Sequence, residues 1–306
     1  IVLPLGIAGP LLAAMDFVDS LAKVGTIVGS VDEILNGEEQ DHGHNPVQFH
    51  GRDIALSHVS FGYHADQEVL HDVNLTIPAG TMTAFVGPSG SGKSTIAKLI
   101  AGFWDVSAGA ITLGGQDLNR IPLPQLYDQV AFVSQDNYLF DESIRENIRM
   151  GNPAATDEEV EDAAKAANCH DFIMQLEQGY DTLAGDAGDR LSGGERQRIT
   201  IARAMLKPSS VVILDEATAY ADPENEALIQ QAISKLVAGK TLIVVAHRLN
   251  TIRNADQILV VANGNIAGRG TQEELLRECP IYQKMWQDYA GTIEEADLKG
   301  GVENHA

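Results

Sequence analysis

The sequence predicts an α/β fold in which crossover helices join a largely parallel β-sheet. Two apolar runs, residues 211–214 and 242–246, have the unbroken hydrophobic pattern of parallel strands that are buried on both faces. A third apolar run, residues 81–86, leads directly into a glycine-rich loop and then into a predicted helix at 94–101. Strands that alternate with helices in this order are typical of sheets whose faces are covered by helices.

The other predicted elements follow from the same periodicities. Alternating apolar residues indicate a strand at 54–63, and a second strand at 69–77 is stopped by the turn residues Pro78 and Gly80. We also expect a strand at 130–134, helical structure within 143–178 and a helix at 196–206.

The first 35 residues differ from the rest of the chain. Residues 1–15 carry no charge and contain prolines and glycines, which are more frequent in membrane helices than in soluble ones. The run is shorter than the roughly 20 apolar residues that cross a bilayer. Helical spacing of apolar residues then continues over 16–35. We therefore expect residues 1–35 to be the truncated end of a last transmembrane helix with its cytoplasmic extension. A buried core helix is the alternative, which the glycines and prolines disfavour.

Composition divides the remainder into three parts. Residues 36–46 are polar and contain glycine and proline, so they predict a linker. Residues 47–290 hold the predicted strands and helices and form one catalytic domain. Residues 291–306 are acidic and polar, and we expect this tail to be poorly ordered.

Charge and cysteine content exclude several classes of protein. The chain has 21 Lys and Arg against 43 Asp and Glu, a net charge of −22, so we expect no nucleic-acid partner. The two cysteines, Cys169 and Cys279, lie far apart and form neither a disulfide framework nor a metal-binding pattern. Both are predicted to be packing residues in a reducing compartment.

Residues 87–94 match the phosphate-binding loop pattern of Gly, four residues and Gly-Lys-Ser. The loop follows a strand and opens a helix, so its backbone N–H groups can surround an anion; an unliganded glycine-rich turn is the alternative. We expect Lys93 to reach the β- and γ-phosphates of ATP and the Ser94 hydroxyl to bind Mg²⁺. The predicted nucleotide-binding residues here are Gly87, Pro88, Ser89, Gly90, Ser91, Gly92, Lys93, Ser94 and Thr95.

The apolar strand at 211–214 ends in two adjacent carboxylates. Asp215 emerges at the carboxyl end of the strand, where α/β sheets bind ligands, and is predicted to hold Mg²⁺ through water. Successive side chains of a strand point to opposite sides, so Glu216 is directed elsewhere than Asp215. This suits a general base that polarises the attacking water.

The run 191–197, Leu-Ser-Gly-Gly-Glu-Arg-Gln, resembles the signature motif of the ABC ATPases. The resemblance extends from residue 54 to about residue 289. It implies a P-loop NTPase of the ABC ATPase fold, with a mixed sheet core, an antiparallel β subdomain and an α-helical signature subdomain. It also implies that Ser192, Gly193 and Gly194, at a helix N-terminus, contact the γ-phosphate of ATP held by a second copy. An ordinary serine N-cap is the alternative reading.

The same resemblance assigns roles to four further residues. It implies that Tyr63 stacks on adenine and that Gln135 senses Mg²⁺ or water and contacts the membrane domain. It implies that Asp222 couples the two nucleotide sites of a dimer and that His247 lies at the γ-phosphate. The alternatives are a core aromatic at 63, a surface glutamine at 135, a structural histidine at 247 and, at 222, the N-cap of a helix that begins at Pro223, a role compatible with coupling. Glu216, His247, Lys93 and Gln135 are thus the predicted catalytic residues, and Ser94, Gln135 and Asp215 the predicted metal-binding ones.

Residues 140–148 and 182–188 are similar to the exporter-type branch, in which the ATPase is fused behind transmembrane helices. Three positions depart from the family pattern without removing a catalytic group: Glu195 stands where Gln is common, Asp186 where Glu is common, and Tyr220 where Ser is common. The run 217–226 is similar to exporter-fold proteins that import siderophores.

The expected function is ATP hydrolysis that drives transport across a membrane, with ATP and Mg²⁺ as ligands. The expected partners are a second ABC ATPase domain, in a homo- or heterodimer, and a transmembrane domain, which would place this domain at the cytoplasmic face of a cell membrane. The alternatives are a non-hydrolysing half of a heterodimeric transporter, a siderophore importer with the exporter fold, and an ABC ATPase that acts on DNA or ribosomes. The net charge disfavours the last of these.

Overall fold

The structure is a computed structural model of the 306-residue chain, and it describes residues 3–36, 40, 42–64, 67–215, 223–246 and 249–289. The chain divides into two compact units, Ile1–Asp41 and His42–Ala306, which are described separately. The predicted acidic tail, 291–306, lies outside the described residues. The predicted domain boundaries stay predictions.

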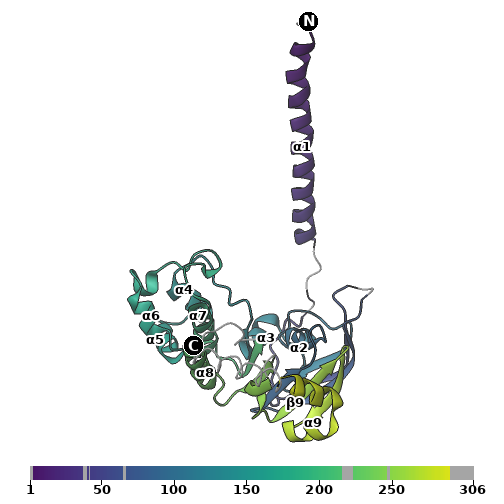
Figure 1. The fold of residues 1–306 in the computed structure, drawn as a ribbon, viewed down its shortest axis with the longest axis vertical. Coiled ribbons are helices and arrows are strands. Elements are labelled where there is room, and N and C mark those ends of the chain that lie inside the picture. The colour runs from purple at the N-terminus through teal and green to yellow at the C-terminus, as the bar shows by residue number, and fades with distance from the viewer. Residues whose placement is uncertain are drawn as a thin grey trace, which may run out of the picture. The chain divides into compact units, whose positions relative to one another are not determined.

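The first unit consists of one helix, α1 (Leu3–Leu35), 33 residues long (Figure 1). Its helical structure over 16–35 agrees with the spacing of apolar residues, and large apolar side chains such as Phe17, Leu21 and Val28 are exposed within this chain. Among the described residues, no helix combines the length and the apolar character needed to cross a bilayer. The interpretation of residues 1–35 as the end of a transmembrane helix stays a prediction.

The second unit is built around a six-stranded sheet with the strand order β10-β9-β3-β8-β7-β6. The five strands from β9 to β6 are mutually parallel, and β10 pairs antiparallel with β9 at one edge. The strands are β3 (Met82–Val86), β6 (Val130–Val133), β7 (Val211–Asp215), β8 (Thr241–Val245), β9 (Gln257–Ala262) and β10 (Asn265–Gly270).

Both faces of this sheet are covered, which explains why its central strands are mostly apolar. In β7 every residue is buried, and alternate residues enter different cores. Val211 and Ile213 pack with α2 (Lys93–Ile100), whereas Val212 and Leu214 pack with the helices on the opposite face. The sequence prediction of parallel strands buried on both sides is confirmed.

A second, antiparallel sheet has the strand order β2-β1-β4-β5. Its inner face packs on α2 and on one face of the parallel sheet through residues such as Leu56, Val73 and Ile111. The strands are β1 (Ile54–Phe61), β2 (Leu70–Ile77), β4 (Ala108–Leu113) and β5 (Gln116–Asp117).

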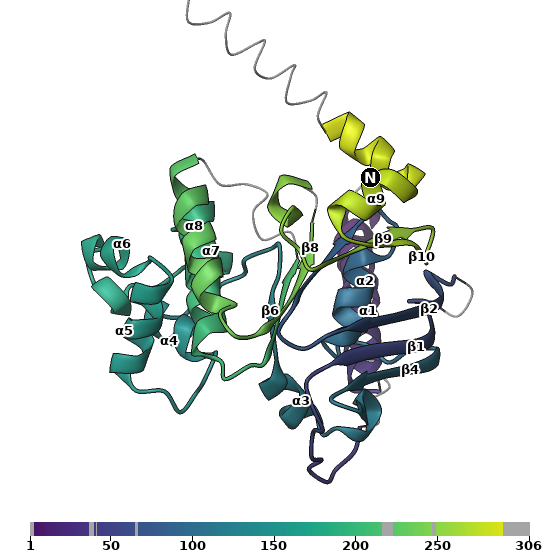
Figure 2. The ribbon, with the colours of Figure 1, turned by 90° about the horizontal axis from the view of Figure 1, so that it is seen from below.

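A group of helices forms the α-helical subdomain on the other side of β6, β7 and β8 (Figure 2). Two of these helices, α5 and α7, begin with capping boxes, in which Thr156 and Ser192 exchange hydrogen bonds with the glutamate three residues later. The helices are α4 (Ile144–Arg149), α5 (Asp157–Ala166), α6 (His170–Gln175), α7 (Gly193–Leu206) and α8 (Pro223–Leu236). The predicted mixed core, antiparallel sheet and helical subdomain are all present.

Several elements were not anticipated from the sequence, namely β4, β5, β9, β10, α3 (Leu123–Gln129) and α9 (Gln272–Glu278). The helical stretch expected within 143–178 is three separate helices. It is interrupted at 150–156, which contains Gly151 and Pro153, and at Asn168, whose left-handed φ of 56° ends α5. Short 3₁₀ helices occur at Leu118–Arg120, Gly179–Asp181, Asp186–Gly188 and Leu249–Ile252.

Candidate functional site

The predicted site residues follow the carboxyl ends of neighbouring parallel strands. The phosphate-binding loop follows β3, Asp215 is the last residue of β7, and Gln135 comes shortly after β6. Since β3, β8, β7 and β6 are adjacent and parallel, these ends meet at one edge of the sheet, which is where open α/β sheets bind ligands.

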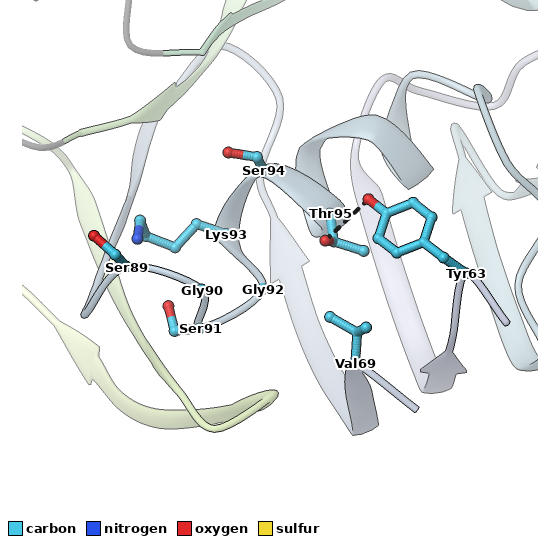
Figure 3. Close-up of a pocket in the computed structure, with 9 residues that line it drawn as sticks. All are labelled: Tyr63, Val69, Ser89, Gly90, Ser91, Gly92, Lys93, Ser94 and Thr95. Carbon is cyan, nitrogen blue, oxygen red and sulfur yellow. Dashed lines mark hydrogen bonds between the residues drawn. The ribbon is translucent and has the colours of Figure 1, made fainter. Parts of the chain in front are cut away.

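A pocket of about 370 Å³ opens over the phosphate-binding loop (Figure 3). Two glycines are required by the path of the loop. Gly87 has a φ of 150°, and a Cβ there would lie 1.9 Å from the carbonyl oxygen of Val261. Gly92 caps α2 with a φ of 104°, which side chains rarely allow. The pocket is lined by Tyr63, Val69, Ser89, Gly90, Ser91, Gly92, Lys93, Ser94 and Thr95.

The first residue of α2, Lys93, is held inside the loop. Its ammonium group donates hydrogen bonds to the carbonyl oxygens of Gly87 and Pro88 at 3.0 and 2.9 Å, and the residue is only 4% exposed. The Ser91 hydroxyl, also in the loop, is buried without a hydrogen-bond partner among the described residues. A cation, an unsatisfied hydroxyl and a helix N-terminus at one pocket together fit a phosphate group.

Two of the three predicted metal-binding side chains, Ser94 and Asp215, are in direct contact. Ser94 Oγ donates a hydrogen bond to Asp215 Oδ1 at 3.0 Å, and Asp215 is 8% exposed. The described residues contain no cluster of three or more His, Cys, Asp or Glu side chains that could hold a metal. One carboxylate and one hydroxyl suit Mg²⁺, which prefers oxygen ligands, keeps several waters and also binds phosphates of the substrate.

Tyr63 stands across the pocket from the loop, just beyond the end of β1. Its hydroxyl lies 3.2 Å from the Thr95 hydroxyl, the contact drawn as a dashed line in Figure 3. Its ring meets the rings of Phe61 and Trp104 nearly at right angles, at centroid distances of 5.0 and 5.5 Å. The residue is 41% exposed, so an aromatic surface is available beside the phosphate-binding loop.

Gln135 is exposed in the loop that follows β6. Its carbonyl oxygen accepts a hydrogen bond from Asn137 Nδ2 at 3.1 Å. Asn137 has a left-handed φ of 46°, and its Oδ1 lies 3.1 Å from the Thr200 hydroxyl on α7. The Gln135 loop is therefore tied to the helix that begins at the signature motif.

The signature residues form an exposed helix N-terminus. Ser192 caps α7, accepting from Glu195 N at 3.3 Å, while its own N–H donates to Glu195 Oε2 at 2.8 Å. Ser192 and Gly193 are exposed, and a Cβ at Gly193 would meet nothing within 4 Å. None of the residues that line the pocket comes from 192–194. Within one chain the described signature residues thus lie apart from the phosphate-binding pocket.

Three predicted site residues, Glu216, Asp222 and His247, lie outside the described residues, as does the unusual Tyr220. The roles assigned to all site residues stay predictions. Sequence reasoning missed Val69, which lines the pocket, and Trp104, which contacts Tyr63. No motif marks Val69. The signal for Trp104 was an aromatic pair, residues 103–104, directly after the helix of the phosphate-binding loop.

The fold and the loop at the carboxyl end of β3 define a P-loop nucleotide-binding domain. Residues 70–219 match the family model described as ABC transporter. The mycobactin import ATP-binding/permease protein IrtA of Mycolicibacterium smegmatis is 46% identical over 282 residues, which cover 92% of this chain and 31% of that protein. The ATP-binding cassette sub-family B member 6 of Mus musculus is 46% identical over 245 residues, covering 80% of this chain and 29% of that protein.

A solved structure of a bacterial Atm1-family ABC exporter with ATP bound superposes with a TM-score of 0.80 and 37% sequence identity, covering 88% of this chain and 48% of that chain. The chain contains an ATP-binding domain of the ABC transporter family, with the exporter-type fold. It spans about a third of the length of the two curated relatives described here.

Proposed function

We propose that this chain is the ATP-hydrolysing part of a membrane transporter, in which ATP binding and hydrolysis drive a substrate across the membrane. The observation that carries the proposal is the pocket over the phosphate-binding loop, where buried Lys93 and the Ser94–Asp215 pair lie together. The similarity to ATP-binding/permease proteins supports the coupling to a membrane domain, with this domain at its cytoplasmic face.

The chemistry of the site would come mainly from position and charge, as in phosphoryl transfer generally. Lys93 and the backbone N–H groups of the loop hold the phosphates. Ser94, Asp215 and Gln135 would hold Mg²⁺, which supplies charge neutralisation when bound. Glu216 would act as the general base for the attacking water, and His247, at the γ-phosphate, would help to orient that water. The last two roles rest on the resemblance to the ABC ATPases.

Hydrolysis would require two such domains, in a homo- or heterodimer. Ser192 and Gly193 are exposed, are not part of their own chain's pocket and present a helix N-terminus suited to an anion. In a head-to-tail pair, this end of α7 would close over the ATP of the partner. Closure of this kind excludes water and completes a catalytic site. Asp222 would couple the two sites of the pair.

Import of a siderophore is a second candidate for the transport step. One relative that is 46% identical is a mycobactin import protein, whereas the similar solved structure is that of an Atm1-family exporter. Vesicles that carry the full-length transporter would distinguish the directions, since only an importer would show ATP-dependent movement of an iron-loaded siderophore towards the ATPase side.

The experiment that tests the proposed activity is ATP turnover measured against protein concentration. The rate per chain is expected to rise with concentration and to fall by at least about 100-fold in Glu216→Gln. Glu158→Gln, at an exposed position on α5, is the matched control and should keep the wild-type rate. A weak rate that neither depends on concentration nor responds to Glu216→Gln would instead indicate a half that binds nucleotide without hydrolysing it.

A further inference from the structure

Trp104 is exposed over 49% of its surface yet contacts two other aromatic residues. It lies in the loop 102–107, between α2 and β4. Its ring centroid is 5.5 Å from that of Tyr63, at an interplanar angle of 88°, and 6.4 Å from that of Phe61. Edge-to-face arrangements of this kind are favourable because the ring edge and the ring face carry opposite partial charges.

The loop that carries Trp104 is anchored to the end of β1 and to Gly62, the residue before Tyr63. Ser107 N donates to Ser60 O at 3.0 Å, and Gly62 N lies 3.4 Å from Ser107 Oγ, so the two bonds flank Phe61. The other end of the loop is fixed to α2, because Phe103 N donates a hydrogen bond to Lys98 O at 3.0 Å. Trp104 is thus presented from a fixed backbone.

The residue after Trp104, Asp105, lies near a buried histidine. His42, 7% exposed, lies with Nε2 3.5 Å from Asp105 Oδ1 and with Nδ1 2.9 Å from the carbonyl oxygen of Ile121. The residue next to Trp104 therefore lies close to the segment that begins this unit.

Tyr63 needs such support because it is itself half-exposed and follows the end of a strand. The contacts of its side chain are the Thr95 hydroxyl on one side and the Phe61 and Trp104 rings on the others. A side chain that must be ordered when a ligand binds lowers the affinity, whereas a side chain already fixed does not.

We propose that Trp104 is a positioning residue for base recognition, which holds the Tyr63 ring in the orientation that stacks on the base of a bound nucleotide. The inference rests on the proposed function, because it requires that the pocket takes ATP. It assigns Trp104 no contact with the phosphates, which lie over the loop 87–94.

The proposal predicts that a change at Trp104 affects binding of the base but not binding of the phosphates. Trp104→Leu should weaken binding of Mg·ATP by roughly 2- to 10-fold, the effect of losing one aromatic contact. It should leave binding of Mg·tripolyphosphate, which has no base, unchanged. Trp104→Phe keeps an aromatic edge and should retain most of the ATP affinity.

The matched control is Phe103→Leu. Phe103 is the neighbouring aromatic residue and is 45% exposed. Its ring contacts that of Phe132, at a centroid distance of 5.1 Å, and not that of Tyr63. It should bind both ligands as the wild type does. A difference between the two leucine variants therefore reports the contact with Tyr63 rather than a general change in the loop.

The experiment is calorimetric titration of the full chain and the three variants with Mg·ATP and Mg·tripolyphosphate, with thermal unfolding as a check of folding. A selective loss of ATP affinity in Trp104→Leu, relieved in Trp104→Phe, is the expected result. Equal affinities for ATP in all variants, or a parallel loss for both ligands, would overturn the role of Trp104. Failure of the wild type to bind ATP would overturn the proposed function and this inference with it.

Discussion

The hydroxyl of Ser94 donates a hydrogen bond of 3.0 Å to a carboxylate oxygen of Asp215, joining two positions that are 121 residues apart. One lies in the first turn of α2 and the other at the end of β7. The contact brings together the two sequence motifs that predict phosphate binding and metal binding. The pair is therefore the most direct place to test whether they form one site.

Asp215→Asn should lower the affinity for Mg²⁺ in the presence of ATP by about 10- to 100-fold, as loss of a charged group around a metal typically does. Binding of ATP in EDTA should change little, because Lys93 and the loop backbone are untouched. Calorimetric titration with and without Mg²⁺ measures both. Equal losses under the two conditions would show that Asp215 supports the loop rather than the metal.

Much of this site follows from sequence because its chemistry depends on local order along the chain. Gly87 to Ser94 need only a preceding strand and a following helix, and both are present. The aromatic residues beside the phosphate-binding loop, Tyr63 and Trp104, were only partly predictable. The family resemblance singled out Tyr63. Its contact with Trp104 joins the segment just after β1 to a residue 41 positions further along the chain, and no local sequence pattern encodes that contact.

The signature helix offers a variant that separates nucleotide binding from dimer-dependent turnover. Gly193 is the first residue of α7, and a Cβ there would meet nothing within 4 Å. Gly193→Ala should therefore fold and bind ATP as the wild type does. If this surface faces the ATP of a second chain, the added methyl group should lower turnover at least about tenfold.

The contrasting variant is Gly87→Ala, since its Cβ would lie 1.9 Å from Val261 O. It should lose ATP binding in the single chain. Binding by calorimetry and turnover at high protein concentration distinguish the two variants. Wild-type turnover in Gly193→Ala would exclude a close approach of phosphate to this end of α7.

Asn147 on α4 is a fully buried side chain that organises the segment between β6 and α4. Its Oδ1 accepts hydrogen bonds from Phe140 N and Arg203 Nη2, both at 2.9 Å, and its Nδ2 donates to Phe140 O at 2.9 Å. Asn147→Ala should lower the free energy of unfolding by about 3 kcal/mol, because it removes the side-chain partner of both Phe140 N and Arg203 Nη2.

Urea unfolding measures this loss. The control is Asn265→Ala, at an exposed position whose side chain bonds only to the nearby carbonyl of Asn263 among the contacts described, and it should change stability by less than about 0.5 kcal/mol. Burial also lowers the pKa of Arg203 to about 10, because the charged guanidinium is removed from water. Equal stability of both variants would contradict the structural role of Asn147.

Sequence indicated helices in this region but not where they end or how they pack. The breaks at 150–156 and Asn168 separate α4, α5 and α6, and the polar network around Asn147 holds the first of them to α7. Helical periodicity reports which face is apolar, whereas the partner of that face depends on residues far away in the chain. The same applies to β9, which pairs with β3 far earlier in the chain. The pairing of β9 with β10 is by contrast a local hairpin around Asn263 and Gly264, and this Asn-Gly turn was a sequence signal that the prediction missed.

Cys169 should make stability depend on pH above neutrality. Burial raises the pKa of the Cys169 thiol to about 12, whereas in the unfolded chain it would titrate near 8.5. Above about pH 8.5 the unfolded state loses this proton and the folded state keeps it, so folding is penalised as the pH rises. The free energy of unfolding should therefore fall by about 1 kcal/mol per pH unit between about pH 9 and 10 through this group alone.

The contribution is isolated by comparing the wild type with Cys169→Ala in urea unfolding at pH 7.5, 9 and 10. The variant loses some packing at every pH, because Cys169 is fully buried in the core of the helical subdomain. Its disadvantage should nevertheless shrink as the pH rises, because the alanine has no proton to lose. Parallel pH profiles for the two proteins would mean that the thiol reaches solvent in the folded state, which would contradict the packing of α5, α6 and α7 around it.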